Sequence, residues 1–331
     1  MNCLLCPRRC GVDREKGQLG YCGETSALRL GFAGIHRGEE PPIAGAGGSG
    51  AIFVSGCNLG CAFCQNHQLS QRRPLSDGES LPFMKPLSQA KIGRPVDAVE
   101  FAEICLALQE KGAENINIVT GSHAAPAICQ GILEARKRGL SIPALWNSSG
   151  YDGIESLEIL KDLFDVYLPD LKTLDQDFAS RFFNAKDYPE KAAMAILKMM
   201  EYRELLFGSK TISGVMVRHL VIPGFLENTR QVLRWFAEHC RGRALLSLMT
   251  QYTPVQSDFM QIESWGDTGI PSRYISKYEY EAVLAMLDEF KIDDGFCQEY
   301  VTGSDWLPDF NRSNPFSSEL SIPVWHWAKN R

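Results

Sequence analysis

The chain has 331 residues and a formal net charge of −6, with 44% hydrophobic and 22% charged residues. This length suits one large α/β domain, or a main domain with a small accessory one. The composition is that of an ordinary globular protein rather than a disordered or membrane-embedded one. The mild acidity, without a run of lysine and arginine, argues against duplex nucleic acid as the main partner.

The N-terminus, Met1-Asn2-Cys3, lacks the charged start and apolar run of a signal peptide, and no stretch approaches 18 consecutive apolar residues. We therefore expect a cytoplasmic protein with no membrane partner. In that reducing compartment, clustered cysteines predict metal ligation or catalysis rather than disulfides. Four of the eleven cysteines are scattered and are expected to pack in the core: Cys105, Cys129, Cys240 and Cys297.

Residues 1–49 are rich in cysteine, glycine and arginine and are interpreted as a small metal-binding module with a glycine-rich link. Four cysteines within twenty residues predict a metal site, because so short a segment cannot bury a core of its own. A zinc staple and an iron–sulfur cluster both fit, and the spacing of the first pair slightly favours zinc. Arg8, Arg9 and Arg14 would offset the charge of the thiolates. The ligands would be Cys3, Cys6, Cys10 and Cys22.

The stretch from Gly45 to Gly50 spells G-x-G-x-x-G but precedes an apolar run, whereas a dinucleotide fingerprint follows a strand and opens a helix. It is interpreted as a flexible link instead. The polar segment His36-Arg37-Gly38-Glu39-Glu40-Pro41 before it is expected to be an exposed loop.

Residues 50–331 are interpreted as one core with a C-terminal tail packed on it. Apolar runs that predict strands alternate with helix-like segments, which indicates βαβ units, a parallel sheet and a partial (β/α)6 barrel. The predicted strands are 51–54, 115–119, 142–146, 165–168, 215–222 and 244–249. The predicted helices lie near 96–111, 126–139, 154–163, 189–206 and 228–241. A loop or lid is expected over residues 70–95, and the tail begins near residue 295.

Polar residues follow each predicted strand, where the ligand site of a parallel α/β fold forms. The first strand is followed by Cys57, Cys61 and Cys64 in the spacing C-x3-C-x2-C. Three thiolates leave one iron of a [4Fe–4S] cluster open. An open iron can chelate S-adenosylmethionine (SAM), and one electron then gives a 5′-deoxyadenosyl radical that abstracts hydrogen. A zinc site or incidental core cysteines are the alternatives.

This spacing, with Phe63 just before the last cysteine, resembles the radical SAM superfamily. The chain more narrowly resembles the PflX family, which is related to pyruvate formate-lyase activating enzyme, from Cys3 to about Tyr252. The resemblance implies a TIM-like partial barrel of the radical SAM type. The segments that carry it are 52–59, 64–66, 115–120, 147–151, 167–172 and 217–224.

The resemblance also implies SAM-binding positions. Glycyl-radical activases carry a Gly-Gly-Glu type motif after the second strand, where this chain has Thr120-Gly121-Ser122-His123. Ser122 or His123 would take its role, unless His123 is an ordinary polar loop residue. Asp170 and Lys172 resemble the Asp-x-Lys element of activases, with a surface ion pair as the alternative. Further positions of this kind are Phe63, Asn147 and Arg218.

Arg218 and His219 are adjacent within an apolar run, so one of them is expected to point into the barrel. Capping or lining the core is the alternative for either.

The sequence thus predicts a radical SAM oxidoreductase, with a glycyl-radical activating enzyme as one candidate. Radical modification of a small molecule, peptide or nucleotide is the second, and a non-catalytic iron–sulfur electron carrier is the third. Expected cofactors are a [4Fe–4S] cluster, SAM and a second metal at the N-terminus. Expected partners are a reductant such as flavodoxin or ferredoxin and, for an activase, a glycyl-radical protein.

Overall fold

The computed structural model describes residues 3–70, 92–208, 212–255, 269, 271–304 and 306–329. Its strands are β1 (Leu28–His36), β2 (Ser49–Val54), β3 (Arg94–Val96), β4 (Ile116–Val119), β5 (Ala144–Ser148), β6 (Val166–Pro169), β7 (Leu206–Phe207), β8 (Ile212–Leu220), β9 (Leu245–Met249), β10 (Gly295–Cys297) and β11 (Ser321–His326). Its α-helices are α1 (Pro41–Ala44), α2 (His67–Ser70), α3 (Ala98–Glu110), α4 (Ala125–Lys137), α5 (Ile154–Leu160), α6 (Gln176–Phe183), α7 (Tyr188–Tyr202), α8 (Leu226–His239) and α9 (Lys277–Phe290).

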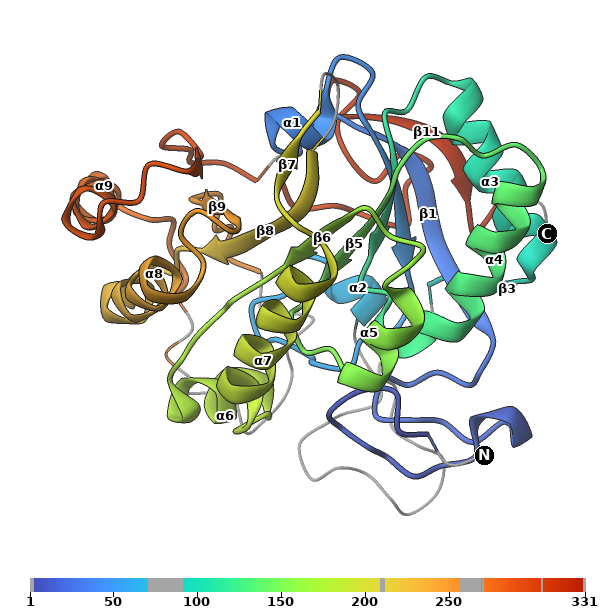
Figure 1. Ribbon diagram of the computed structural model, residues 1–331, viewed down its shortest axis with the longest axis horizontal. Coiled ribbons are helices and arrows are strands. Elements are labelled where there is room, and N and C mark those ends of the chain that lie inside the picture. Colours follow the sequence, from blue (N-terminus) through green and yellow to red (C-terminus); the bar gives the residue numbers. More distant parts are fainter. Residues whose placement is uncertain are drawn as a thin grey trace.

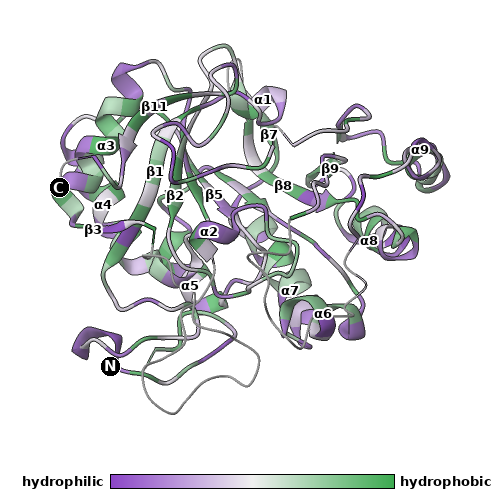
Figure 2. Ribbon diagram, turned by 180° about the vertical axis from the view of Figure 1, so that it is seen from behind, coloured by the Kyte–Doolittle hydropathy of each residue, from purple (hydrophilic) through white to green (hydrophobic). Residues whose placement is uncertain are grey.

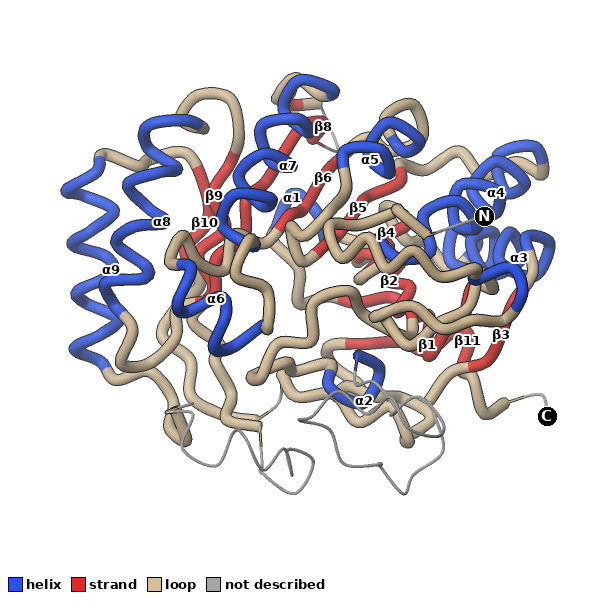
Figure 3. Tube along the Cα trace, turned by 90° about the horizontal axis from the view of Figure 1, so that it is seen from below, coloured by secondary structure: helices blue, strands red, loops and turns tan. Residues whose placement is uncertain are grey.

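One sheet organises these elements, in the strand order β10-β9-β8-β6-β5-β4-β2-β1-β11. The six predicted strands are β2, β4, β5, β6, β8 and β9, and each pairs in parallel with its neighbours among them. The α/β fold class with a partial barrel is therefore confirmed. Strand β10, which the sequence analysis did not predict, extends the parallel part beside β9. Figure 3 shows the larger helices following the outer side of the curved sheet.

Antiparallel strands complete the other edge of the sheet, where β1 pairs with both β2 and β11. Strand β1 lies in the segment assigned to the N-terminal module, and its pairing places it in the main sheet. Glycines interrupt the apolar pattern of β1, so the strand was not predicted. They stand there because neighbouring groups pack closely against the backbone. A Cβ on Gly31 would lie 2.4 Å from Leu69 Cδ2, and one on Gly34 would lie 2.7 Å from the Ile322 carbonyl. The tail packs on the core through β11.

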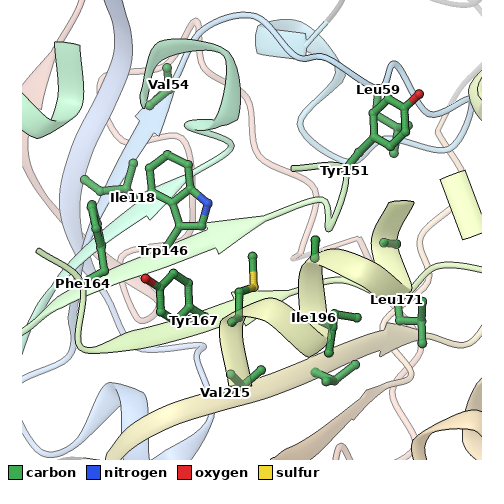
Figure 4. Close-up of a cluster of buried hydrophobic side chains, with 14 of the residues drawn as sticks. Val54, Leu59, Ile118, Trp146, Tyr151, Phe164, Tyr167, Leu171, Ile196 and Val215 are labelled. Carbon is green, nitrogen blue, oxygen red and sulfur yellow. The ribbon is translucent and has the colours of Figure 1, made fainter. Parts of the chain in front are cut away.

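The outer face of the sheet is covered by helices and is strongly apolar. Trp146 and Tyr167, on neighbouring strands, are fully buried in one apolar cluster, in which Trp146 packs beside Phe164 and Ile196 contributes from α7 (Figure 4). Figure 2 shows mostly hydrophobic strands surrounded by helices with mixed colouring. Each large apolar side chain buried in this way contributes about 1.5–3 kcal/mol. This layer fixes the strands whose ends carry the site.

The inner face is closed at its N-terminal end by helix α1. Ile43 of α1 packs with an apolar layer of inward residues near the starts of the strands. Two residues farther along β5, β8 and β9 the inward positions become polar, because side chains alternate across a strand, whereas on β6 the apolar Leu168 comes before Asp170. The apolar layer comprises Leu145, Val166, Met216 and Leu245.

The glycine-rich segment before β2 is packed, so its prediction as a flexible link was wrong. A Cβ on Gly47 would lie 2.1 Å from the Gly112 carbonyl, and one on Gly50 would lie 2.5 Å from the Asn115 carbonyl. Gly48 has a φ of 88°, which favours glycine. These glycines allow close approach of the loop before β4.

The N-terminal cysteine segment lies at the opposite end of the strands from α1, below their carboxyl ends (Figure 1). Of the predicted loop over 70–95, residues 71–91 lie outside the described residues, and β3 ends it by pairing with β1. Within the described residues, no helix combines the length and apolar character that a membrane crossing requires.

Candidate active site at the barrel mouth

A cavity of about 590 Å³ occupies the inside of the partial barrel. It is lined by residues that follow or end the parallel strands, as predicted, and also by the segment between β1 and α1. At one end lie Cys57, Cys61 and Cys64, and at the other lie Glu39, Glu40, Arg218 and Ser247. We call the first group the mouth and the second the floor.

The mouth begins where β2 ends, and Gly56 turns the chain there with a φ of 88°. The backbone N–H of Leu59 donates to Cys57 Sγ at 3.3 Å, and the Ser70 hydroxyl donates to Cys64 Sγ at 3.2 Å. Burial raises the pKa of the Cys64 thiol to about 11 and also raises that of Cys61. Thiolates at these positions therefore need a bound cation, which fits an iron cluster.

The cysteine spacing also bears on the kind of metal group. None of the eleven cysteines is in a disulfide. Within the described part of the chain, no three His, Cys, Asp or Glu side chains converge closely enough to hold a single ion. A cubane cluster carries its thiolates on separate corners, so it does not require the close convergence that a single tetrahedral ion needs, and this holds for the N-terminal cysteines as well as for those of the mouth.

Asp170 and Lys172 form an ion pair in the cavity, with Lys172 Nζ 2.5 Å from Asp170 Oδ2 and side chains 19% and 22% exposed. It is thus not the surface ion pair of the alternative interpretation. Burial acts to lower the pKa of Lys172, but the charge and hydrogen bond of Asp170, together with the neighbouring Cys61 and Tyr188, raise it on balance. The Tyr188 hydroxyl fixes the turn, lying 2.9 Å from the carbonyl oxygens of Ser149 and Asp170.

Phe63 and Asn147 line the same cavity, as does Thr120. Phe63 is held in an aromatic group with Phe182, Phe183 and other rings, which anchors the cysteine loop against α6. Thr120 has a φ of 63°, a strained conformation for a β-branched residue. Its position was not singled out from the sequence.

Ser122 and His123 do not line the cavity. Both are buried in the short turn before α4, where Ser122 lies near Asp152 and His123 Nε2 lies 2.8 Å from the Ser55 carbonyl. Burial raises the pKa of Asp152. The structure therefore does not bring these two residues to the other predicted cofactor-binding positions.

The floor is built around Arg218, which points into the barrel from β8. Its guanidinium donates to Glu39 and Glu40, whose side chains are only 11% and 9% exposed. The Ser247 hydroxyl donates to Glu40 at 2.5 Å, and the Asn117 amide donates to Glu39 at 3.2 Å. Burial acts to raise the pKa of Glu40, but Arg218 lowers it.

The prediction of an exposed loop for residues 36–41 was therefore wrong, because the barrel supplies a buried counter-charge from a distant strand. His219, the neighbour of Arg218, points the other way. It lies between the Leu171 carbonyl and Thr229 and lines the core, where burial lowers its pKa to about 4.

The N-terminal cysteines lie outside the cavity. Cys6 and Cys22 are buried, whereas Cys3 and Cys10 are half-buried. Burial raises the pKa of Cys6 to about 12 and that of Cys22 to about 11.

Of the scattered cysteines, three are buried as predicted, namely Cys105, Cys129 and Cys240. Cys297 is half-buried and lines the cavity.

Residues far from the strand ends complete the cavity and were not predicted from the sequence. Ser247 could have been found from its register, since it lies between the inward-facing Leu245 and Met249. No local signal pointed to Trp306 and Phe316, which line the cavity from the C-terminal segment.

Residues 51–236 match the family model described as the radical SAM superfamily, and the chain belongs to that superfamily. Membership implies a [4Fe–4S] cluster and SAM, and the matched range includes all three cysteines of the mouth.

Among curated proteins, the uncharacterized protein MJ0674 of Methanocaldococcus jannaschii is 27% identical over 293 residues, which cover 88% of this chain and 76% of that protein. Among solved structures, SuiB of Streptococcus suis bound to precursor peptide SuiA is 14% identical with a TM-score of 0.48, over 73% of this chain and 46% of SuiB. A domain of pyruvate-formate lyase-activating enzyme from Bacteroides vulgatus is 13% identical with a TM-score of 0.36, over 53% of this chain and 91% of that domain.

Proposed function

We propose that this chain abstracts hydrogen from a compact polar substrate bound in the barrel, using a cluster held by Cys57, Cys61 and Cys64. The observation that carries the proposal is that these cysteines and the polar floor line one cavity. When bound, the cluster and SAM supply a carbon-centred radical strong enough to remove hydrogen from unactivated carbon.

The residues of the mouth would hold these groups in place. The Leu59 N–H and the Ser70 hydroxyl donate to sulfur and would stabilise the negative charge of thiolates. Asp170 and Lys172 present opposite charges side by side, which suits the ammonium and carboxylate of a methionyl group. The aromatic group around Phe63 keeps water from that side of the loop.

The floor supports a substrate with hydrogen-bond donors or positive charge. Glu39 and Glu40 share the single cation of Arg218, which leaves one excess negative charge in a nearly enclosed place. A group that reaches the floor from the mouth meets carboxylate oxygens and the Ser247 hydroxyl. A pure electron carrier would need no such cavity.

A specific observation also favours a second candidate, activation of a glycyl-radical protein. The Asp170–Lys172 pair, which resembles the Asp-x-Lys element of activases, lies in the cavity with the cysteines. This candidate agrees with the resemblance to the PflX family. Either function needs an electron from a reductant of the flavodoxin or ferredoxin class, and both fit an enzyme of the cytoplasm.

The proposal includes a second metal, zinc or an iron–sulfur cluster, bound by the N-terminal cysteines. Its support is that two of their sulfurs, those of Cys10 and Cys22, lie close to the same point beside Gly20. A Cβ on Gly20 would lie 3.4 Å from Cys22 Sγ and 3.8 Å from Cys10 Sγ. The thiol of Cys6 is buried beside them and would gain a counter-ion from the metal.

The test is an anaerobic assay on the full chain after reconstitution with iron and sulfide. Dithionite and SAM are added, and 5′-deoxyadenosine and methionine are measured. We expect SAM cleavage, and its absence in protein that holds the cluster would refute the enzymatic proposal.

The two candidates are separated by incubation with deuterated small-molecule extracts or with a glycyl-radical protein. Deuterium in 5′-deoxyadenosine from a small molecule supports the first candidate. A glycine-centred doublet on the added protein supports the second.

A further inference from the structure

Arg8 lies inside the N-terminal cysteine motif, yet its guanidinium contacts the loop of the reactive cysteines. Its Nε donates to the Asn58 carbonyl at 2.9 Å and its Nη2 to the Leu59 carbonyl at 3.2 Å. The same side chain donates to the carbonyls of Phe183 and Asn184 at the end of α6. One side chain thus joins the cysteine motif, the Cys57–Cys61 loop and α6.

All three nitrogen atoms of the Arg8 guanidinium donate hydrogen bonds. All four acceptors are backbone carbonyls, and such charge-assisted bonds are stronger than neutral ones. The guanidinium carbon also lies 3.6 Å from the centre of the Tyr21 ring, next to Cys22, and 5.3 Å from that of Tyr151. A lysine has neither the planar fork nor the number of donors to replace these contacts.

Two further contacts join the same segments. The Asn58 side chain, next to Cys57, lies beside Cys6 and donates to the Tyr151 carbonyl at 2.5 Å. Gly56 lies against the N-terminal segment, because a Cβ there would be 2.9 Å from the Cys22 carbonyl. Each residue of the reactive loop from Gly56 to Leu59 other than Cys57 therefore has a partner in the cysteine motif.

A segment of about twenty residues with four cysteines holds its shape only when a metal binds it. We infer that metal binding by Cys3, Cys6, Cys10 and Cys22 orders the reactive loop through Arg8 and Asn58, so that cluster retention at Cys57, Cys61 and Cys64 depends on the N-terminal metal. Arg8 is a positioning residue in this scheme. The inference rests on the proposed function only in that both cysteine sets bind metal.

The first experiment compares Arg8→Ala with Arg9→Ala in the full chain. Arg9 is the matched control, since its side chain pairs on the surface with Glu155 and both side chains are more than half exposed. Iron release from reconstituted protein to bathophenanthroline is followed without SAM. We expect Arg8→Ala to release the reactive cluster's iron about tenfold faster than wild type, since it loses several charge-assisted bonds, and Arg9→Ala to match wild type.

Arg8→Lys keeps the charge and is expected to fall between the two, which also covers the case in which Arg8→Ala fails to fold. The electron-spin signal of the reduced cluster provides a second readout. We expect a broadened signal in Arg8→Lys at equal iron content. Wild-type iron release and an unchanged signal in Arg8→Lys would overturn the positioning role.

The second experiment removes one metal site at a time. In the triple variant Cys57→Ser, Cys61→Ser, Cys64→Ser, metal analysis is expected to find one zinc or about four irons per chain, and either result supports the N-terminal site. Finding neither would overturn the inference.

In the double variant Cys6→Ser, Cys22→Ser, we expect the iron of the reactive cluster to be released faster than in wild type, as in Arg8→Ala. Retention at the wild-type rate would show that the loop does not depend on the N-terminal metal. Because these measurements need no SAM, a wild-type protein that holds its cluster but does not cleave SAM would refute the proposed function alone.

Discussion

The two ends of the cavity handle buried charge in opposite ways. At the floor, Arg218 and its two glutamates compensate one another within the chain, and Ser247 and Asn117 add hydrogen bonds. At the mouth, three thiols gather with only a few donors aimed at sulfur, and burial raises the pKa of two of them, Cys61 and Cys64. The floor is complete as folded, whereas the mouth becomes complete only with a bound group.

The difference also separates what each end does. The floor, in which two carboxylates share one guanidinium, fixes shape and offers an excess negative charge to a substrate. The mouth lacks a counter-ion for its cysteines, so binding a metal cluster there is favourable. Changes at the mouth should therefore affect cofactor binding more than folding, and changes at the floor should affect folding first.

The largest effect is expected for Cys61→Ala at the mouth. Two thiolates cannot anchor the cluster, so SAM cleavage and the reduced cluster's electron-spin signal should both be lost. Cys129→Ala, in the core between α4 and its neighbours, is the matched control and should retain both. A retained signal in Cys61→Ala would mean that the ligand assignment is wrong.

At the floor, Arg218→Met should destabilise the protein by about 3 kcal/mol at pH 7, because it leaves two buried carboxylates without a cation. In the wild type Arg218 lowers the pKa of Glu40 below its ordinary value of 4.5. The stabilisation from that carboxylate is thus fully present above pH 4.5 and is lost as the pH falls through the folded pKa.

In Arg218→Met the carboxylates take up protons more easily, so its deficit should shrink between pH 7 and pH 5. Urea unfolding at several pH values measures this. Arg230→Met, which breaks a surface pair with Glu289, is the control and should cost under about 1 kcal/mol at every pH. An equal deficit at pH 5 and pH 7 for Arg218→Met would argue against the charged floor.

The smallest effect is expected for Ser247→Ala, which removes one hydrogen bond from Glu40. We expect a loss of about 1 kcal/mol in unfolding free energy, with SAM cleavage in the absence of substrate unchanged. A deficit in cluster content instead would show that the floor and the mouth are not separate.

Much of the fold followed from the sequence because its signals are local. The six parallel strands and the five predicted helices carry apolar runs and helical periodicity within each segment and appear near the predicted places, whereas α6 was not predicted. Strand β1 was not predicted because Gly31 and Gly34 interrupt its apolar pattern, and glycine stands at these positions because Leu69 and β11 pack closely against them. The burial of the segment with Glu39 and Glu40 was not predicted because its partner, Arg218, lies on a distant strand.

By itself, the sequence determined the superfamily chemistry. The three cysteines of the mouth lie within eight residues, in the loop after one strand, so their proximity does not depend on how distant segments pack. Only the tertiary structure decided which polar residues meet them. Arg218 faces the cavity and His219 faces the core, while the side chains of Ser122 and His123 do not line the cavity. Burial and distant counter-charges fix these side-chain directions, and a local sequence pattern predicts neither burial nor a distant partner.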